Sequence, residues 1–203
     1  MRDWWLRALL VLQRPRPVFV ALRDDSKESL ADRAEPVLAI VLLAGIAGVL
    51  STSAAGSLMD DSSYDGLLVA VWAFIAGSLY GMFGYFAVGA LLYGGAKALG
   101  SQGTYRRARH LLAFAAVPLA LSLVLLPIRL VVYGEALFRT GGSDHGAGAR
   151  VFNGLQIAFL LWAVALLIVG VRSVHGWTWA RAAAACALAV AGPIAVALVL
   201  SSL

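Results

Sequence analysis

The stretch from Gly66 to Ala96 contains no charged residue, and this feature limits most strongly what the chain can fold into. As one α-helix it would be about 47 Å long, whereas the hydrocarbon core of a bilayer is about 30 Å thick. We therefore predict a membrane-spanning helix that tilts strongly, protrudes from the bilayer or breaks. A break is most expected at Gly81-Met-Phe-Gly84, where two glycines lie close together.

Small residues recur at helical spacing in this stretch and in an earlier uncharged run, 36–59. Residues three or four positions apart lie on the same face of a helix, so each set forms one row. Because water cannot drive helices together in lipid, such rows let two backbones approach closely. The residues that we expect to pack helices, or to join copies of the chain, are Gly48, Thr52, Gly56, Gly77, Gly81 and Gly84.

Composition favours a membrane protein over a soluble one. The chain is 61% hydrophobic and 13% charged, whereas a typical soluble domain is about half apolar and about a quarter charged. Five uncharged runs are separated by charged loops, so we predict an all-α polytopic membrane protein with five transmembrane helices. Pro118 and Pro127 interrupt the third run, and Pro118 is expected to shape helix packing there. The predicted spans are 36–59, 66–96, 111–128, 151–171 and 182–203.

Residues 1–35 precede these spans and form a cytosolic or interfacial segment. Arg7 and Arg14 are seven positions apart, which places them on one helical face, while tryptophans and leucines occupy the rest. That pattern is typical of an amphipathic helix lying in the headgroup region, which Pro15 would end. The alternative is a disordered cytosolic tail. Residues 23–35 mix both charges and are predicted to be a solvated linker.

Lysine and arginine are distributed unevenly between the two sides of such a bundle. With five crossings, the N-terminal segment shares one side with loops 97–110 and 172–181, and together they hold 13 of the 16 positive residues. Because positive loops stay in the cytoplasm, we predict a multi-pass protein of the cell (inner) membrane, with the N-terminus inside and the C-terminus outside. These cations suit anionic membrane lipids and not nucleic acid. The arginines expected at lipid headgroups are Arg7, Arg14, Arg106, Arg107 and Arg109.

Ionisable residues are missing from the interior of all five runs. Membrane enzymes and ion-coupled transporters carry such groups at mid-bilayer depth. Arg129 comes nearest, and its long side chain is expected to reach the membrane interface. The histidines have no metal-ligand spacing; they are His110, His145 and His175. We therefore predict no catalytic residue, no metal site and no cofactor.

Polar residues near the membrane have two possible uses. An acidic turn that contains Asp60, Asp61 and Asp65 would bind a divalent cation weakly, or it is an ordinary external turn, which we favour. Uncharged polar residues inside the runs would line a solute path or, more commonly, form interhelical hydrogen bonds. These residues are Ser78, Tyr80, Ser122, Asn153 and Gln156.

Three stretches carry a family resemblance. They are Leu12-Gln-Arg-Pro-Arg-Pro-Val-Phe-Val-Ala-Leu22, the loop and helix from Gly103-Thr-Tyr-Arg-Arg107 to Pro118, and the stretch from Trp162 to Ala182. With the five-span layout, they resemble the Yip family of Ypt/Rab-interacting membrane proteins, in particular its small prokaryotic-type members. The resemblance covers roughly residues 12–203.

This resemblance implies a five-span fold with a cytosolic N-terminus and a non-enzymatic role in recruiting small GTPases or organising membranes. The sequence departs from eukaryotic members because it lacks their long N-terminal cytosolic domain and their Asp-Leu-Tyr-Gly-Pro type motif. The expectation therefore extends to the fold and not to small GTPase binding.

Two functions remain open at this point. The first is a non-enzymatic module that binds or organises membrane lipids or partner proteins, other copies of the chain included. The alternative is a transporter, permease or scramblase for a small apolar or lipidic substrate, with a cavity framed by the third run and the over-long second run. A membrane enzyme is a distant third, because no set of acid, base and nucleophile can be assembled.

Overall fold

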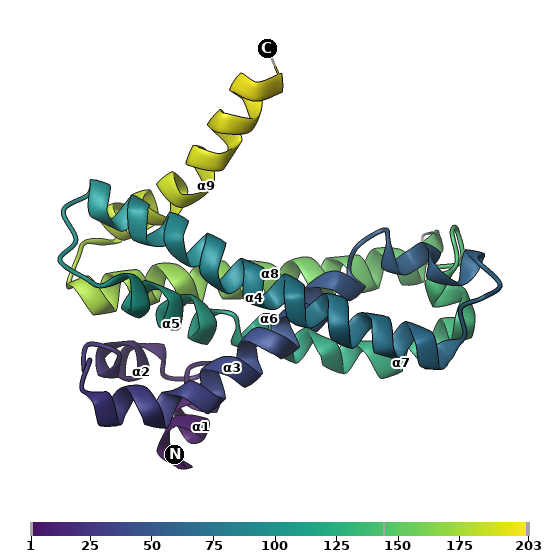
Figure 1. The fold of residues 1–203 in the computed structure, drawn as a ribbon, viewed down its shortest axis with the longest axis horizontal. Coiled ribbons are helices and arrows are strands. Elements are labelled where there is room, and N and C mark those ends of the chain that lie inside the picture. The colour runs from purple at the N-terminus through teal and green to yellow at the C-terminus, as the bar shows by residue number, and fades with distance from the viewer. Residues whose placement is uncertain (1, 144, 202–203) are drawn as a thin grey trace. The chain divides into compact units, whose positions relative to one another are not determined.

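A computed structural model gives the structure of residues 2–143 and 145–201, with described side chains at 3–143 and 145–191. The described residues form helices and no strand, which confirms the all-α class. The α-helices are α1 Arg2–Leu10, α2 Pro15–Ala21, α3 Lys27–Leu50, α4 Gly66–Ala98, α5 Tyr105–Ala115, α6 Val117–Leu121, α7 Leu125–Tyr133, α8 Gly146–His175 and α9 Trp179–Ser201 (Figure 1). The 3-10 helices are η1 Ala55–Asp60, η2 Ser122–Val124 and η3 Gly134–Phe138.

Within the described residues, four stretches are long and apolar enough to cross a membrane, namely α3, α4, the stretch Tyr105–Phe138 and α8. This finding confirms a polytopic membrane protein. Helix α9 has 23 residues, and a span of the hydrocarbon core needs about 20. The fifth predicted span, 182–203, ends outside the described residues.

The helix bounds differ from the predicted spans at several places. Helix α3 begins at Lys27, inside the predicted linker, and ends at Leu50, so that residues up to 59 continue in turns and η1. Helix α4 runs unbroken from Gly66 to Ala98, and the expected break at Gly81–Gly84 is absent. Glycine retains its backbone N–H, so it can weaken a helix without interrupting the hydrogen-bond ladder.

Prolines divide two other regions. Pro118 lies in the first turn of α6, and Pro127 lies in the first turn of α7, so the third predicted span is a series of short helices. Proline is tolerated at such positions because its missing N–H has no partner there. Pro15 opens α2 for the same reason, instead of ending a longer helix. Arg7 and Arg14 therefore do not share one helix, since α1 ends at Leu10.

The chain divides into two compact units. Unit 1 comprises residues 1–38, 83–115 and 164–203, and unit 2 comprises residues 39–82 and 116–163. Helices α3, α4 and α8 each contribute one part to either unit. Two glycines with positive φ follow helices directly, Gly134 after α7 and Gly176 after α8, and a side chain would be strained at either position.

Unit 1 has an apolar core built from its short N-terminal helices. Phe19 of α2 is fully buried and lies against Gly170 of α8, where an added Cβ would be 3.0 Å from the ring. Trp4 of α1 contacts Phe114 of α5 with ring centroids 5.6 Å apart. These contacts attach α1 and α2 to α8 and α5.

Unit 2 contains a close crossing between α3 and α4. A Cβ at Gly45 would lie 2.2 Å from the carbonyl oxygen of Gly77, and one at Gly81 would lie 2.3 Å from that of Val41. A Cβ at Gly77 would lie 2.6 Å from Cα of Ile46. Side chains at these positions would keep the backbones apart, so the glycines permit the crossing. We call Gly45, Gly77 and Gly81 the glycine seam.

The other residues of the predicted rows lie differently. A Cβ at Gly48 would meet the ring of Tyr80 at 2.7 Å, whereas Gly56 and Gly84 have nothing within 4 Å of that position. Thr52 donates its hydroxyl hydrogen to the carbonyl of Val49 at 2.6 Å. The predicted rows therefore include residues inside and outside the close crossing.

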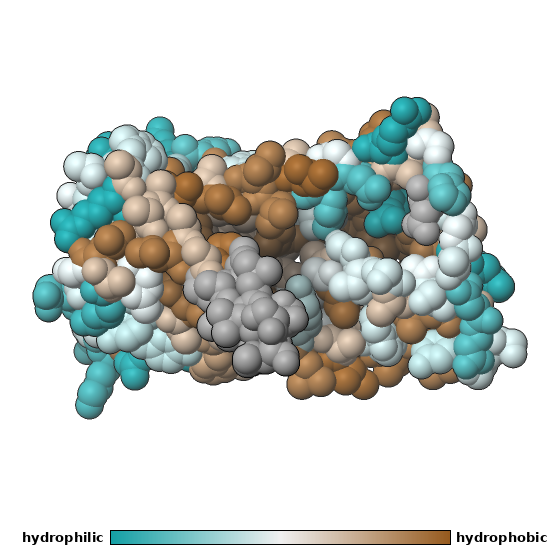
Figure 2. All heavy atoms as spheres, turned by 90° about the horizontal axis from the view of Figure 1, so that it is seen from above, coloured by the Kyte–Doolittle hydropathy of each residue, from teal (hydrophilic) through white to brown (hydrophobic). Residues whose placement is uncertain are grey.

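Large apolar side chains are exposed along the long helices. Examples are Leu67 and Phe83 of α4, at 73% and 74%, and Val131 of α7, at 88%. Figure 2 shows apolar side chains as brown areas on the visible face, beside groups of hydrophilic residues. Exposure of this extent is unusual in a soluble monomer and suits helices that face lipid.

Candidate functional site

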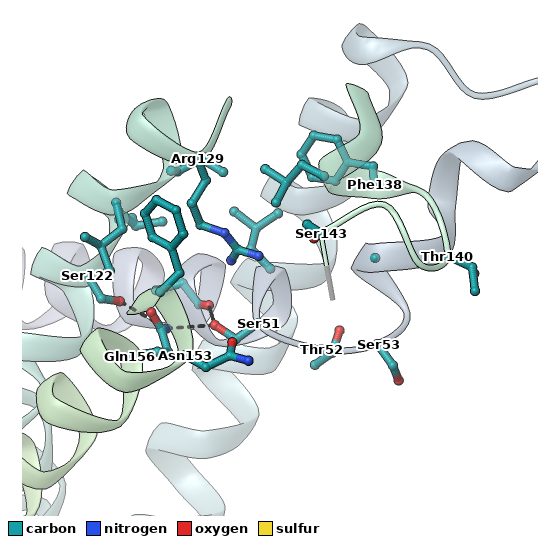
Figure 3. Close-up of a pocket in the computed structure, with 18 residues that line it drawn as sticks. Ser51, Thr52, Ser53, Ser122, Arg129, Phe138, Thr140, Ser143, Asn153 and Gln156 are labelled. Atoms are coloured by element: carbon teal, nitrogen blue, oxygen red, sulfur yellow. Dashed lines mark hydrogen bonds between the residues drawn. The ribbon is translucent and has the colours of Figure 1, made fainter. Parts of the chain in front are cut away.

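Unit 2 encloses a cavity of about 460 Å³. Residues of α3 and of 51–56, of the stretch 122–143, and of α8 line it (Figure 3). Ligand-binding pockets have volumes of about 300–1,000 Å³, so the cavity can hold a small molecule or a lipid headgroup. Six hydroxyl side chains contribute to its lining, namely Ser51, Thr52, Ser53, Ser122, Thr140 and Ser143.

A hydrogen-bonded group fixes one wall of this cavity. Nε2 of Gln156 donates to Oγ of Ser51 at 2.8 Å and to Oγ of Ser122 at 3.4 Å. Each serine hydroxyl in turn donates to a carbonyl of its own segment, Ala47 and Leu119, both at 2.7 Å. The hydrogen bond between segments expected of Gln156 is thereby confirmed, and it joins the turn after α3, η2 and α8.

Arg129 is the charged residue among the described residues that line the cavity. Its side chain comes from α7 and points into the space that Asn153 and Gln156 also face (Figure 3). The guanidinium carbon lies 5.8 Å from the centre of the Phe152 ring. The sequence predicted that this side chain reaches the membrane interface, and that stays a prediction; the structure shows that it lines a pocket with both polar and apolar residues.

An acidic side chain binds Thr140, one of the residues that line the cavity. Asp60 of η1 accepts hydrogen bonds from the backbone N–H of Thr140 at 3.0 Å and from its hydroxyl. These bonds lower the pKa of Asp60, because they stabilise the carboxylate more than the neutral acid. Asp61 and Asp65 accept from the backbone of Ser63 and Leu68 instead, both at 2.9 Å. Each carboxylate of the acidic turn thus has a local structural partner.

Unit 1 has a charged cluster around Asp25. Its carboxylate pairs with Arg33 at 3.3 Å and with Arg107 at 2.5 Å. Arg33 is 0% exposed, so the prediction of a solvated linker over 23–35 is wrong at this residue. The guanidinium carbon of Arg33 lies over the ring of Trp4, 5.6 Å from the ring centre. The cluster ties the α2–α3 connection to α5.

The arginines expected at lipid headgroups have different surroundings. Arg109 lies against three aromatic rings, with its guanidinium carbon 4.6 Å from the centres of the Phe86 and Tyr105 rings. Arg107 binds Asp25 and the carbonyl of Arg23. Arg14 and Arg106 are exposed, and Arg7 is half-buried over the Trp4 ring. The five residues thus differ in how much of their charge can meet a ligand.

Helix α1 is apolar on two faces. Trp4 and Ala8 are buried against the rest of unit 1. Residues 5, 6, 9 and 10 form the opposite face, and all four are exposed, with Leu6 at 59% and Leu9 at 61%. We call these four residues, Trp5, Leu6, Leu9 and Leu10, the exposed apolar face of α1.

The histidines are dispersed. Nε2 of His175 lies 2.7 Å from Oγ of Ser101, and its ring stacks on Trp177. His110 is buried in α5, and His145 is exposed. Among the residues that the structure describes, no three His, Cys, Asp or Glu side chains come close enough to hold a metal ion.

Sequence reasoning missed Gly45, Arg33 and the cavity position of Arg129. Gly45 lies three positions before Gly48 of the predicted row, and the structure places it in the crossing of α3 and α4. The charge of Arg33 suggested solvent, although the acidic residue eight positions before it was a usable signal for pairing.

Comparison with known proteins agrees with the fold described above. A family model described as the Yip1 domain matches residues 9–202. No curated protein and no solved structure gave a significant match. Because the match extends over almost all of the helices of both units, the chain belongs to the Yip1 domain family of membrane proteins.

Proposed function

We propose that this Yip1-domain protein is a non-enzymatic membrane organiser whose helix α1 lies in the headgroup region of the cytoplasmic leaflet. The observation that carries the proposal is the exposed apolar face of α1, opposite the buried Trp4 and Ala8. Burying one exposed leucine yields about 1.5–3 kcal/mol, so four large apolar side chains favour contact with lipid over contact with water. The contacts of α1 with α5 hold that face in place.

Basic residues of unit 1 add a preference for anionic lipid. Arg14 and Arg106 are exposed, and Arg7 is half-buried with its guanidinium over the Trp4 ring. A cation near an anionic leaflet contributes about 1 kcal/mol. Apolar insertion and charge together would position the helix and gather anionic lipid around unit 1. This role requires no bond-breaking chemistry.

The position of α1 can be measured with one labelled cysteine. Cys186 is the only cysteine, so Cys186→Ala gives a background into which Leu9→Cys introduces a single site for an environment-sensitive fluorophore. In proteoliposomes we expect blue-shifted emission from position 9 and quenching by lipids spin-labelled near the headgroup. Glu28→Cys, an exposed polar position at the start of α3, is the matched control and should be quenched by aqueous iodide. Equal iodide access at positions 9 and 28 would refute the proposal.

The alternative function, a permease or scramblase, is favoured by one observation, the polar cavity of unit 2. A path for lipid headgroups needs polar side chains below the membrane surface. Proteoliposomes that contain fluorescent lipids in both leaflets distinguish the two functions. An organiser leaves the inner-leaflet lipids protected from a membrane-impermeant reductant, whereas a scramblase exposes them within minutes.

A further inference from the structure

The cavity of unit 2 has a polar wall whose hydrogen-bond donors are already bound within the protein. The amide nitrogen of Gln156 donates to two serine hydroxyls, Oγ of Ser51 at 2.8 Å and Oγ of Ser122 at 3.4 Å (Figure 3). Each serine gives its own hydroxyl hydrogen to a backbone carbonyl, that of Ala47 for Ser51 and that of Leu119 for Ser122. A hydroxyl has one hydrogen and two lone pairs, and a side-chain amide has two N–H donors and one oxygen. The wall therefore still offers a lone pair on each serine and the amide oxygen of Gln156, all of which are acceptors.

A wall of acceptors favours a ligand that brings hydrogen-bond donors. The orientation of the Gln156 amide follows from the serines, because a hydroxyl that donates to a carbonyl can only accept from a second side chain. An ionised phosphate or carboxylate group has acceptors only, so it would meet lone pairs at this wall. An ammonium group donates, but moving its charge out of water costs much more free energy than moving a neutral hydroxyl. Neutral hydroxyl groups are therefore the ligand chemistry that fits this wall.

The other lining residues suit a ligand that has an apolar part as well. Asn153 adds an amide that can both donate and accept, and leucines and Phe138 add apolar surface. The guanidinium of Arg129 lies over the Phe152 ring and interacts with other groups of the protein, so we assign it no part in binding. Few polar groups that orient a ligand, beside apolar surface that holds the remainder, are typical of small-molecule sites.

From this arrangement we propose that the cavity of unit 2 binds a neutral polyol group, such as the glycerol group of an uncharged lipid, through the acceptors of Ser51, Ser122 and Gln156. The hydrogen bonds among these residues hold three segments together before a ligand arrives, and a preorganised site loses little binding energy to ordering its own side chains. The site is separate from the surface proposed for α1, because its lining residues belong to unit 2, whereas α1 belongs to unit 1. Either proposal can therefore fail without the other.

Protection of a cysteine in the cavity from a maleimide measures binding at this site. In the Cys186→Ala background, Ser53→Cys places one thiol in the lining, and Ser57→Cys places one outside it as the matched control; both positions are exposed. The full-length protein is reconstituted in phosphatidylcholine nanodiscs, whose lipid has no hydroxyl group. The probes are monooctanoylglycerol, its dimethyl ether, which keeps the chain and the oxygens but has no O–H donor, and free glycerol.

We expect monooctanoylglycerol to slow labelling at position 53 about fivefold more than its dimethyl ether does, because only the former can donate hydrogen bonds to the wall. Neither probe should change the labelling rate at position 57. Protection by glycerol only at much higher concentration supports a lipid ligand, and protection at the same concentration supports the hydroxyl site but assigns it to a free polyol. Equal protection by monooctanoylglycerol and its ether, or protection by none of the probes, would overturn the proposal.

Variants in the Ser53→Cys background then test whether the acceptors provide the selectivity. Gln156→Leu removes the amide oxygen and should abolish the preference for monooctanoylglycerol over its ether. Ser51→Ala removes one acceptor but leaves the bond between Gln156 and Ser122, so it provides the test should Gln156→Leu fail to fold, and it should reduce the preference to less than about twofold. Ser62→Ala removes an exposed hydroxyl outside the lining and should leave the preference unchanged. A preference that persists in both Gln156→Leu and Ser51→Ala would show that the acceptor wall does not bind the ligand.

Discussion

Replacing Gly81 with alanine tests the glycine seam between α3 and α4. The new Cβ would lie 2.3 Å from the carbonyl oxygen of Val41 and 3.1 Å from Cα of Gly45. Ordinary van der Waals contact begins at 3.4 Å, so the two backbones must move apart by about 1 Å. Both neighbouring atoms belong to the backbone of α3, and therefore no change of rotamer can relieve the overlap.

The free-energy cost follows from two opposing effects. Alanine is favoured over glycine in a helix by about 1 kcal/mol. Overpacking of a tight interface costs about 1–3 kcal/mol, and we expect the upper end because separating the helices also loosens the contacts at Gly45 and Gly77. Gly84→Ala has the same gain in helix propensity, but its Cβ meets nothing within 4 Å. The difference in unfolding free energy between the two variants therefore gives the cost of the steric overlap alone, which we expect to be about 3 kcal/mol.

The comparison can be made by unfolding the purified protein in mixed micelles with increasing sodium dodecyl sulfate, followed by tryptophan fluorescence and circular dichroism. Gly81→Ala should unfold at a lower fraction of the denaturing detergent than wild type, and Gly84→Ala at the same or a higher fraction. Gly45→Ala should behave like Gly81→Ala, since its Cβ would lie 2.2 Å from the carbonyl oxygen of Gly77. Stabilities of Gly81→Ala and Gly84→Ala that agree within about 0.5 kcal/mol would show that the seam is not close-packed.

Three further predictions concern the charged groups and the orientation of the chain. Asp25→Ala should lower the unfolding free energy by about 2 kcal/mol, because it leaves the guanidinium of Arg33 buried without its carboxylate. Arg33→Met should lower the unfolding free energy by less than about 1 kcal/mol. Equal losses for the two variants in the same detergent titration would contradict this reasoning. Hydrogen bonds from Thr140 lower the pKa of Asp60, so the link between η1 and η3 contributes stability above the carboxyl group's unfolded pKa and loses it as the pH falls through the folded one. The hydrogen-exchange protection of the Thr140 amide should therefore decrease at acid pH in wild type and stay constant in Asp60→Asn, and a constant value in both would refute the link. The charge distribution predicts that the exposed positions 57 and 102 lie on opposite sides of the membrane. In the Cys186→Ala background, an impermeant maleimide applied to intact cells should therefore label Ser57→Cys and not Gln102→Cys. The reverse labelling pattern would show that the predicted orientation is wrong.

The membrane class and the helical fold were predictable because they depend on composition and on long uncharged runs. Such runs need only be long and apolar, and neither property requires knowledge of a neighbouring helix. The continuity of α4 was less predictable. Two glycines close together weaken a helix by about 1 kcal/mol each, but contact of Gly81 with the backbone of α3 supports the same stretch. Tertiary packing decided the outcome there.

The cavity was beyond sequence reasoning for a different reason. Its lining comes from three regions that are distant in sequence, and none of them has a polar pattern that stands out alone. Ser122 and Gln156 were expected to form interhelical hydrogen bonds, and they do, yet the same bonds define a wall of the cavity. Arg129 was placed by its distance from the centre of a run, whereas its direction depends on the short helices around Pro118 and Pro127.

A final prediction concerns how strongly individual arginines of unit 1 attract anionic lipid. Arg106 and Arg109 contribute equally to the net charge, although Arg106 is exposed and Arg109 lies among aromatic rings. Stacking on a ring face and partial burial reduce the field that a cation presents to a surface.

Arg106→Gln should therefore weaken binding of neutral-detergent-solubilised protein to anionic lipid nanodiscs by about fivefold, which corresponds to about 1 kcal/mol per cation. Arg109→Gln removes the same formal charge three residues further along α5, yet it should change this affinity less than about twofold. Binding is compared at one ionic strength, with the detergent titration used to verify that both variants are folded. Equal losses from the two substitutions would mean that formal charge, and not the contacts of each guanidinium, sets the attraction to lipid.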